Sequence, residues 1–295
     1  GVCFHLPRCA VTMRFASLGS GSEGNALMVQ AGETVVMMDC GFGLAATEAR
    51  LQRAGLMPHD VDAIVVTHEH SDHIGGVARF AYKYKLPVWL THGTAKVFNQ
   101  GSLPSALVNF VDPHQHFTVG DIQVTPYLVP HDAFEPVQYV FSDGNVRLGV
   151  LTDTGTITAH IEGTLSGCDA LVLECNHDLD MLMAGPYPAS LKRRVSGKFG
   201  HLDNATAASL LAKIDCSRLK HIFAAHLSQR NNQPKLARAA LAGALGTRNK
   251  KADVKSAFLQ CSTEELLLRC CVFSGRSSGF SGFNRFSSSI FRSIY

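Results

Sequence analysis

The chain of 295 residues is 46% hydrophobic and 17% charged, with a net charge of +3, so it can bury a sizeable core. No stretch reaches the about 18–20 apolar residues that span a bilayer. The opening residues lack the basic start and long apolar core of a secretory signal. Nine cysteines without a CxxC pair argue against both a disulfide framework and a thiolate zinc site. We therefore expect a cytoplasmic protein that does not enter a membrane.

The predicted elements form an early group of strands, a mixed region and a late group of strands. Runs rich in β-branched residues between turn residues predict strands, and apolar residues at helical spacing predict helices. Strands are expected within residues 13–19, 26–30, 34–41, 61–68, 87–91, 117–133, 136–155, 169–178 and 219–228. Helices are expected within residues 44–56, 73–85, 93–100, 204–214 and 234–245. This order predicts two sheets packed together with helices outside.

Composition divides the chain into three parts. Residues 13–247 are predicted to form one folded domain, and residues 1–12 an N-terminal extension that is not native to it. Residues 248–295 end in a stretch rich in Ser, Gly, Arg and Phe with little periodicity. We expect this part to be a disordered or foreign tail.

Charge is unevenly distributed along the chain. Residues 1–189 carry 9 Lys and Arg against 19 Asp and Glu, a balance of −10, whereas residues 190–295 carry 18 against 5, a balance of +13. The basic part begins with LKRRVSGKFGH at residues 191–201. This segment is either a solvated helix face or a surface for a polyanion such as nucleic acid.

A cluster of polar side chains ends the strand predicted at residues 61–68. The sequence VVTHEHSDHIGG places His68, His70, Asp72 and His73 within six residues. His68 and His70 are two apart on an extended segment and can reach one ion, while Asp72 and His73 lie where a helix begins and can face a second ion. Such groups are ligands for zinc, iron and manganese, and they are costly to bury without a partner. The pattern predicts a metal centre.

The HxHxDH pattern of these four residues resembles that of the metallo-β-lactamase fold superfamily. The resemblance extends over residues 14–246 and implies an α/β fold, a four-layer αββα sandwich of two mixed β-sheets with helices on the outer faces. It also implies two divalent metal ions (Zn, Mn or Fe) bound at strand ends. The other metal-site positions of the family are matched by Asp39 in MMDCG, His131 in YLVPHDA, Asp153 in VLTDTG and His226 in FAAHLS.

The same resemblance implies a role for each of these side chains. The ligands fall into two groups joined by a bridging Asp153: His68, His70 and His131 for one ion, and Asp72, His73 and His226 for the other. A hydroxide held between the two ions is the expected nucleophile, so Asp72 and Asp153 count as catalytic. Asp39 is expected to support the site by hydrogen bonding.

Residues 173–211, from LECNHD to ATAASLL, closely resemble the YycJ/WalJ-like group of this superfamily, which consists of 5′→3′ double-stranded DNA exonucleases. The resemblance implies a metal-dependent phosphodiesterase or exonuclease with DNA as its partner. Cys175 and Asp203 stand where we expect serine in that group, and Asp203 adds a negative charge near the expected phosphate path. The residues expected to contact the nucleic acid are Lys192, Arg193, Arg194, Lys198 and Asn204.

Several alternatives remain open at this point. His201 is expected to be catalytic, as a donor to a phosphate oxygen or to the leaving group, but it also suits a residue before a helix capped by Asp203 or Asn204. His177 is either a support for the metal site, a substrate contact or a buried hydrogen-bonded histidine. The alternative function is a small-molecule hydrolase on the same metals: a cyclic phosphodiesterase, a thioesterase or a weak β-lactam hydrolase. The third possible function is that of a non-catalytic, metal-bound scaffold that binds partners through its basic half.

Overall fold

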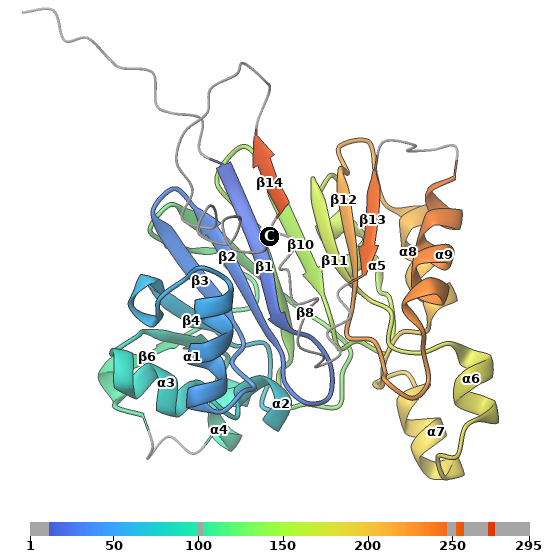
Figure 1. Cartoon of the computed structure of the whole chain (residues 1–295), viewed down its shortest axis with the longest axis horizontal. Coiled ribbons are helices and arrows are strands. Elements are labelled where there is room, and N and C mark those ends of the chain that lie inside the picture. The colour runs from blue at the N-terminus through green and yellow to red at the C-terminus, as the bar shows by residue number, and fades with distance from the viewer. Residues whose placement is uncertain (1–11, 99–102, 247–251, 257–270, 275–295) are drawn as a thin grey trace, which may run out of the picture.

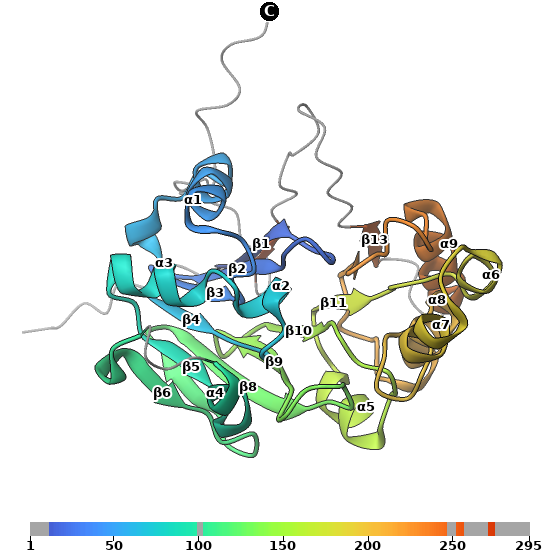
Figure 2. The same ribbon diagram turned by 90° about the horizontal axis from the view of Figure 1, so that it is seen from below.

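The computed structural model describes residues 12–98, 103–246, 252–256 and 271–274. Within these ranges the chain forms two mixed sheets of seven strands each, packed face to face (Figure 1). Helices cover the outer faces of both sheets, which confirms the predicted four-layer sandwich (Figure 2). Residues 1–11 and most of 248–295 lie outside the described residues, so the domain boundaries drawn from composition stay predictions.

The first sheet joins an antiparallel half to a parallel half. Strands pair antiparallel from β14 to β3 and parallel from β3 to β6. Across the sheet the order is β14 (Cys271–Ser274), β1 (Thr12–Gly19), β2 (Ala26–Ala31), β3 (Thr34–Met38), β4 (Ala63–Val65), β5 (Val88–Leu90) and β6 (Val108–Phe110). The parallel strands β3 and β4 therefore end at the same edge of the sheet.

The second sheet has the same plan. Its strands pair parallel from β13 to β10 and antiparallel from β10 to β7. Across the sheet the order is β13 (Asp253–Ser256), β12 (His221–Ala225), β11 (Ala170–Glu174), β10 (Arg147–Leu151), β9 (Val137–Ser142), β8 (Ile122–Leu128) and β7 (Phe117–Val119). The carboxyl ends of β10, β11 and β12 thus lie side by side.

Apolar side chains from both sheets fill the space between them. Phe15 of β1 and Phe223 of β12 meet edge to face, with ring centroids 4.9 Å apart. Tyr139 of β9 is fully buried, and its hydroxyl donates to the Val66 carbonyl just after β4, at 2.7 Å. A buried tyrosine needs such a partner. This bond ties the second sheet to the strand that leads into the histidine cluster.

The helices complete the outer layers. In the described ranges the α-helices are α1 (Leu44–Arg53), α2 (Ser71–Ile74), α3 (Val77–Tyr84), α4 (His92–Val97), α5 (Ala159–Leu165), α6 (Leu179–Ala184), α7 (Ala189–Val195), α8 (Asn204–Lys213) and α9 (Pro234–Leu245), with 3₁₀ helices at Pro58–Asp60 and Ser105–Leu107. None of these helices is long and apolar enough to cross a bilayer. Leu51 of α1 and Phe80 of α3 are buried against the first sheet, and Leu210 of α8 and Leu241 of α9 are buried against the second.

The helix predicted within residues 73–85 is instead divided into α2 and α3. Gly75 and Gly76 separate the two helices. A Cβ on Gly76 would lie 1.9 Å from the carbonyl oxygen of Phe42, so only glycine allows the chain to pass this close to the loop after β3. The division leaves α2 as a single turn directly after the histidine cluster.

Two strands come from the segment predicted to be a tail. Strand β13 pairs in parallel with β12, and β14 pairs antiparallel with β1. Both extend an edge of a sheet (Figure 1). The remainder of residues 248–295 lies outside the described residues, and its character stays a prediction.

Candidate metal centre

The candidate site lies where the parallel strands of both sheets end. Asp39 follows β3, Asp153 follows β10 and His226 follows β12, and each has a positive φ of 60°, 56° and 54° respectively. The left-handed region is unfavourable for non-glycine residues, and such strain collects at functional sites. Among the described non-glycine residues only Lys85, at a helix end, shares this conformation. The strained positions therefore mark the site without reference to any motif.

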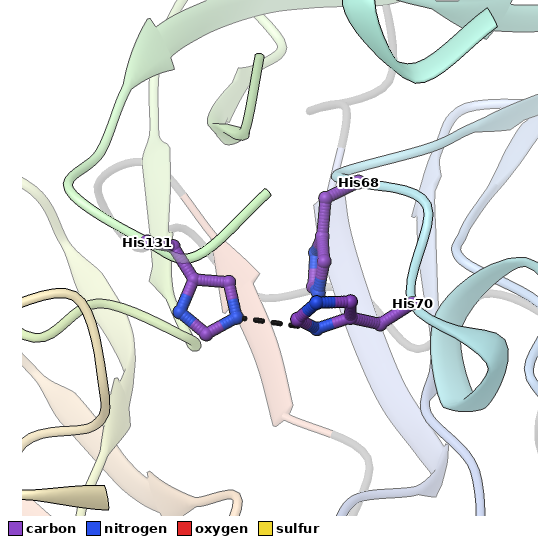
Figure 3. A group of neighbouring side chains, drawn as sticks. All are labelled: His68, His70 and His131. Carbon is purple, nitrogen blue, oxygen red and sulfur yellow. Dashed lines mark hydrogen bonds between the residues drawn. The ribbon is translucent and has the colours of Figure 1, made fainter. Parts of the chain in front are cut away.

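Three histidines form the first group of candidate ligands. The rings of His68, His70 and His131 face one another in Figure 3, and their ligand atoms lie within 4.8 Å of one another. His131 Nδ1 donates to the Gly200 carbonyl at 3.1 Å, and His70 Nε2 donates to the Asp132 carbonyl at 3.2 Å. The remaining nitrogens, His131 Nε2 and His70 Nδ1, lie 3.4 Å apart, and their lone pairs point toward each other.

This arrangement fits a cation. Among the described residues, His68 Nε2 is buried and has no hydrogen-bond partner, whereas its Nδ1 contacts Thr67 Oγ1 at 3.0 Å. Three imidazole lone pairs that converge in a buried space are unfavourable unless a metal ion or proton lies between them. Burial also lowers the pKa of His68 and of His131, which favours the neutral, metal-binding form of both rings.

Asp72, His73 and His226 form the second group, again with ligand atoms within 4.8 Å. His73 Nδ1 donates to Asp39 Oδ2 at 2.8 Å, which turns its Nε2 toward Asp72 Oδ2 at 3.6 Å. Asn25 Nδ2 reaches Asp72 Oδ2 at 3.1 Å. Asp39 therefore forms a hydrogen bond with a candidate ligand, and the supporting role that the resemblance implied for it stays a prediction.

The buried carboxylate of Asp153 lies between the histidines of the second group. Its Oδ2 is 3.3 Å from His73 Nε2, and its Oδ1 is 3.2 Å from His226 Nδ1. Asp153 also groups with His68 and His73 within 4.8 Å. In the described part of the chain, Oδ2 is buried without a hydrogen-bond partner. A buried carboxylate oxygen of this kind suits a second ligand role toward a divalent ion.

The electrostatics of the second group are those of an anionic centre. Burial alone would raise the pKa of Asp153, but His226 and His73 hold it well below its usual range. Burial alone would lower the pKa of His73, but Asp153 and Asp39 raise it to about 10. The Asp153 carboxylate therefore remains charged near neutral pH, and a positive charge must accompany it.

Glu174 is a functional candidate that the sequence reasoning did not identify. It is fully buried at the end of β11, and its Oε1 accepts from His201 Nδ1 at 2.8 Å and from His226 Nδ1 at 3.0 Å. These neighbours lower the pKa of Glu174 to about 2, although burial alone would raise it. In turn Glu174 raises the pKa of His201 to about 9 against the lowering effect of burial. The available signal was an acidic residue ending the apolar strand ALVLE.

Three further supports also escaped the sequence reasoning. Thr67 donates from its hydroxyl and its backbone N–H to the two Asp39 oxygens, both at 2.8 Å. Asn25 contacts the second ligand group, as described above. Asp132 lies 3.4 Å from His131 Nε2 and 2.8 Å from Arg194 Nε. All three act through contacts between distant segments, which a single motif does not reveal.

A cleft of about 240 Å³ opens over the centre and runs to helix α7. In Figure 1, α7 and α2 both lie at the lower end of the molecule, where the parallel strands end. The residues lining the cleft include His70, Asp72, Asp132, Asp153, Arg194, His201 and His226, together with Ser22, Asn176, Tyr187, Ser228 and Asn231. His201, predicted to be catalytic, therefore faces the same space as the candidate metal ligands.

The predicted nucleic-acid contacts have different surroundings. Arg193 and Lys198 are exposed, Lys192 Nζ donates to the Met183 carbonyl at 2.6 Å, and Arg194 is paired with Asp132. Asn204 is only 6% exposed, and its amide exchanges hydrogen bonds with the amide of Asn232, so the structure leaves it no surface for DNA.

His177 lies in the interior beside α8. Its carbonyl accepts from the Asn204 N–H at 2.9 Å, and Asp203 caps α8 by accepting from two backbone N–H groups. His177 Nδ1 has no hydrogen-bond partner among the described residues, and burial lowers its pKa. The role of His177 in supporting the metal site therefore stays a prediction.

Comparison with known proteins identifies the family of this chain. The family profile described as "Beta-lactamase superfamily domain" matches residues 34–222, more than half of the chain. The chain belongs to the metallo-β-lactamase superfamily. The crystal structure of the metallo-β-lactamase fold protein YhfI from Bacillus subtilis has the same fold, with a TM-score of 0.65 and 16% identity over 83% of this chain and 96% of that one. The predicted family and fold are thus confirmed.

Two curated members of the superfamily are considerably more similar in sequence. The chain is 41% identical to exodeoxyribonuclease YycJ of Bacillus anthracis over 228 residues, which cover 77% of this chain and 86% of that protein. It is 32% identical to exodeoxyribonuclease WalJ of Streptococcus pneumoniae over 231 residues, with the same coverage of 77% and 86%. The chain is accordingly a hydrolase of this superfamily and a homologue of these exodeoxyribonucleases.

Proposed function

We propose that this protein is a dinuclear metal-dependent phosphodiesterase that degrades DNA as an exonuclease. The observation that carries the proposal is the convergence of two ligand groups on the buried carboxylate of Asp153, in a cleft that reaches the basic helix α7. The 41% identity to an exodeoxyribonuclease supports DNA as the substrate. A DNA substrate also agrees with the predicted cytoplasmic location.

We assign the metal ligands as the sequence predicted them. One ion would be held by His68, His70 and His131 and the other by Asp72, His73 and His226, with Asp153 shared between the two groups. When bound, two divalent cations act as Lewis acids on the phosphate and lower the pKa of a water molecule so that it becomes a nucleophile. Nitrogen and carboxylate donors of this kind are compatible with zinc, manganese or iron.

The surrounding residues orient the ligands and supply a proton. Asp39 and the Gly200 carbonyl fix the rings of His73 and His131, each by accepting from Nδ1. Glu174 does the same for His201, so that its Nε2 is the atom available in the cleft. We propose that His201 donates a proton from Nε2 to the leaving oxygen of the phosphodiester.

The basic segment holds the DNA backbone in this proposal. Arg193 and Lys198 are exposed and have no acidic partner among the ion pairs of the described residues. Lys192 and Arg194 lie on α7, but Lys192 already donates to the Met183 carbonyl and Arg194 to the Asp132 carboxylate. They bind the DNA backbone only if these contacts are replaced by contacts to phosphate. Phosphate contacts by such side chains make affinity depend steeply on salt concentration.

A small-molecule hydrolase on the same centre is the second candidate. The cleft of about 240 Å³ is small even for a ligand site, for which about 300–1,000 Å³ is typical. A cyclic phosphodiester, a thioester or a lactam fits in the cleft without contacting Arg193 or Lys198, which do not line it. This candidate therefore predicts turnover that is insensitive to salt and to the loss of these two charges.

One side-by-side assay tests the two candidates. Metal-loaded protein is incubated with end-labelled duplex DNA, bis-p-nitrophenyl phosphate and a chromogenic cephalosporin over a range of salt concentrations. Release of terminal nucleotides that weakens with salt, and that falls much more in Arg193→Ala/Lys198→Ala than hydrolysis of the small diester does, is the expected result. Intact DNA in the presence of rapid small-ester hydrolysis would reject the exonuclease and favour the second candidate.

A further inference from the structure

Two phenylalanines stand exposed on the segments that fix the first ligand group. Phe134 is 71% exposed and Phe199 is 61% exposed, which makes them two of the most exposed large apolar side chains in the described residues. A single exposed apolar residue needs no explanation. The position of these two residues does need an explanation, because the backbones of both are hydrogen-bonded to segments of the candidate metal centre.

The anchoring contacts run to residues that are next to the histidine ligands in the sequence. The Phe199 carbonyl accepts from the Asp132 N–H at 3.1 Å, next to His131. The Phe134 N–H donates to Glu69 Oε1 at 2.8 Å, and Glu69 stands between His68 and His70 in the sequence. Backbone anchoring fixes where the two rings emerge while leaving the rings themselves in solvent.

Both residues are also adjacent to the lining of the cleft. Gly200, directly after Phe199, lines it, and so does Asp132, two residues before Phe134. The exposed cations Arg193 and Lys198 belong to the segment that leads to Phe199. An aromatic ring next to cations that track a phosphate backbone is the arrangement by which proteins hold single-stranded nucleic acid.

The size of the cleft limits what can enter it. A volume of about 240 Å³ holds the sugar-phosphate of one strand but not a duplex. A strand separated from its partner therefore reaches the centre most directly, with the bases next to the bond that is cut unpaired at the mouth of the cleft. Unpaired bases lose their stacking partners, and an exposed aromatic ring replaces them.

We propose that Phe134 and Phe199 stack on the unpaired bases of the strand whose backbone enters the cleft. This inference rests on the proposed exonuclease function and deepens it. The substrate of the centre is then a DNA end with a separated strand, whose bases are held by the two rings and whose phosphates are held by the neighbouring cations. The stacking is independent of base identity, since every base offers an aromatic face.

Substitution by leucine removes the rings and keeps apolar side chains. The test compares wild type with Phe134→Leu/Phe199→Leu, and uses Tyr82→Leu as the matched control because Tyr82 is 65% exposed on α3, outside the cleft lining. Two end-labelled substrates are used: a duplex with three unpaired thymidines on both strands at each end, and the same duplex with three abasic nucleotides instead. The kcat/KM for release of the label is measured on both.

The double variant is expected to lose at least about 5- to 150-fold in kcat/KM on the thymidine ends, since removal of aromatic stacking from a single base already has this effect. On abasic ends wild type and variant should agree within about twofold, because there is no base to stack, and Phe199→Trp should retain activity on thymidine ends. Tyr82→Leu should match wild type throughout.

Two results would overturn the inference. An equal loss on thymidine and abasic ends would mean that the rings act on the fold rather than on bases, and no loss on either would mean that they are not used. If wild type itself spares both DNAs while it hydrolyses bis-p-nitrophenyl phosphate, the proposed function fails, and this inference fails with it.

Discussion

Replacement of Glu174 by glutamine tests whether one buried carboxylate organises this half of the site. Besides the two bonds from His201 and His226, its Oε2 accepts from the backbone N–H groups of Thr154 at 3.0 Å and Leu202 at 3.2 Å. Glutamine has the same shape, but one of its two terminal positions is an NH₂ group. If the NH₂ group takes the Oε2 position, two backbone donors face a donor; if it takes the Oε1 position, both imidazole rings must move a proton from Nδ1 to Nε2 to accept from it.

Two separate estimates give the expected change in the free energy of unfolding. Hydrogen bonds to a charged group contribute about 1.5–3 kcal/mol each, so the loss of two lowers the free energy of unfolding by about 3–6 kcal/mol. The lowered pKa of Glu174, about 2 against an ordinary 4.5, corresponds to about 3 kcal/mol in favour of the charged form. Because the folded pKa is depressed, this contribution is present above the unfolded pKa and is lost only as the pH falls toward 2. Near neutral pH the full effect is expected.

Urea unfolding of the metal-free proteins near neutral pH, followed by circular dichroism, measures this difference. The matched control is Glu162→Gln, which removes an exposed ion pair with Lys213 of 2.9 Å and should change the unfolding free energy very little. A loss below about 1 kcal/mol in Glu174→Gln, similar to that of the control, would refute the reasoning. It would mean that the four donors find other partners.

Three further outcomes are expected. Asp153→Asn should bind less than two equivalents of metal and lose turnover while its far-ultraviolet circular dichroism persists; full turnover after chelation would contradict the metal mechanism. Metal binding near neutral pH should release protons, since the pKa of His73 is raised to about 10 in the metal-free protein. The heat of metal binding measured by calorimetry should therefore vary with the ionisation enthalpy of the buffer. A heat that is independent of the buffer would exclude proton release. Gly41→Ala should lower the melting temperature strongly, because its Cβ would lie 1.7 Å from the Asp72 carbonyl oxygen, whereas Gly43→Ala, with open space around it, should not; equal melting temperatures would contradict the close approach.

The layers of the fold were predictable because they depend on local patterns. Apolar strands that end abruptly in polar residues identified the strand ends, and parallel strands deliver their carboxyl ends to one edge. The strand ends alone did not select the ligands: it was the resemblance to the superfamily that assigned Asp153 and His226 to the same site as His68. The break between α2 and α3 was not predictable from periodicity, because it arises from the contact between Gly76 and the Phe42 carbonyl.

The supporting residues were harder to predict, since their roles depend on partners far along the chain. Asn25 acts on Asp72 across 47 positions, and Glu174 acts on His226 across 52. For the basic segment, the sequence predicted more available side chains than the structure offers. Composition indicates which side chains are charged, but only tertiary structure reveals that Arg194 already has an acidic partner in Asp132.

The contacts around His131 join the metal centre and the basic segment into one unit. His131 Nδ1 donates to the Gly200 carbonyl, the Asp132 N–H donates to the Phe199 carbonyl, and the Asp132 carboxylate pairs with Arg194. Any change that moves residues 194–200 therefore also moves a ring that we assign to the metal. It follows that a loss of DNA cleavage in a variant of α7 identifies a DNA contact only if the metal content of that variant equals that of wild type.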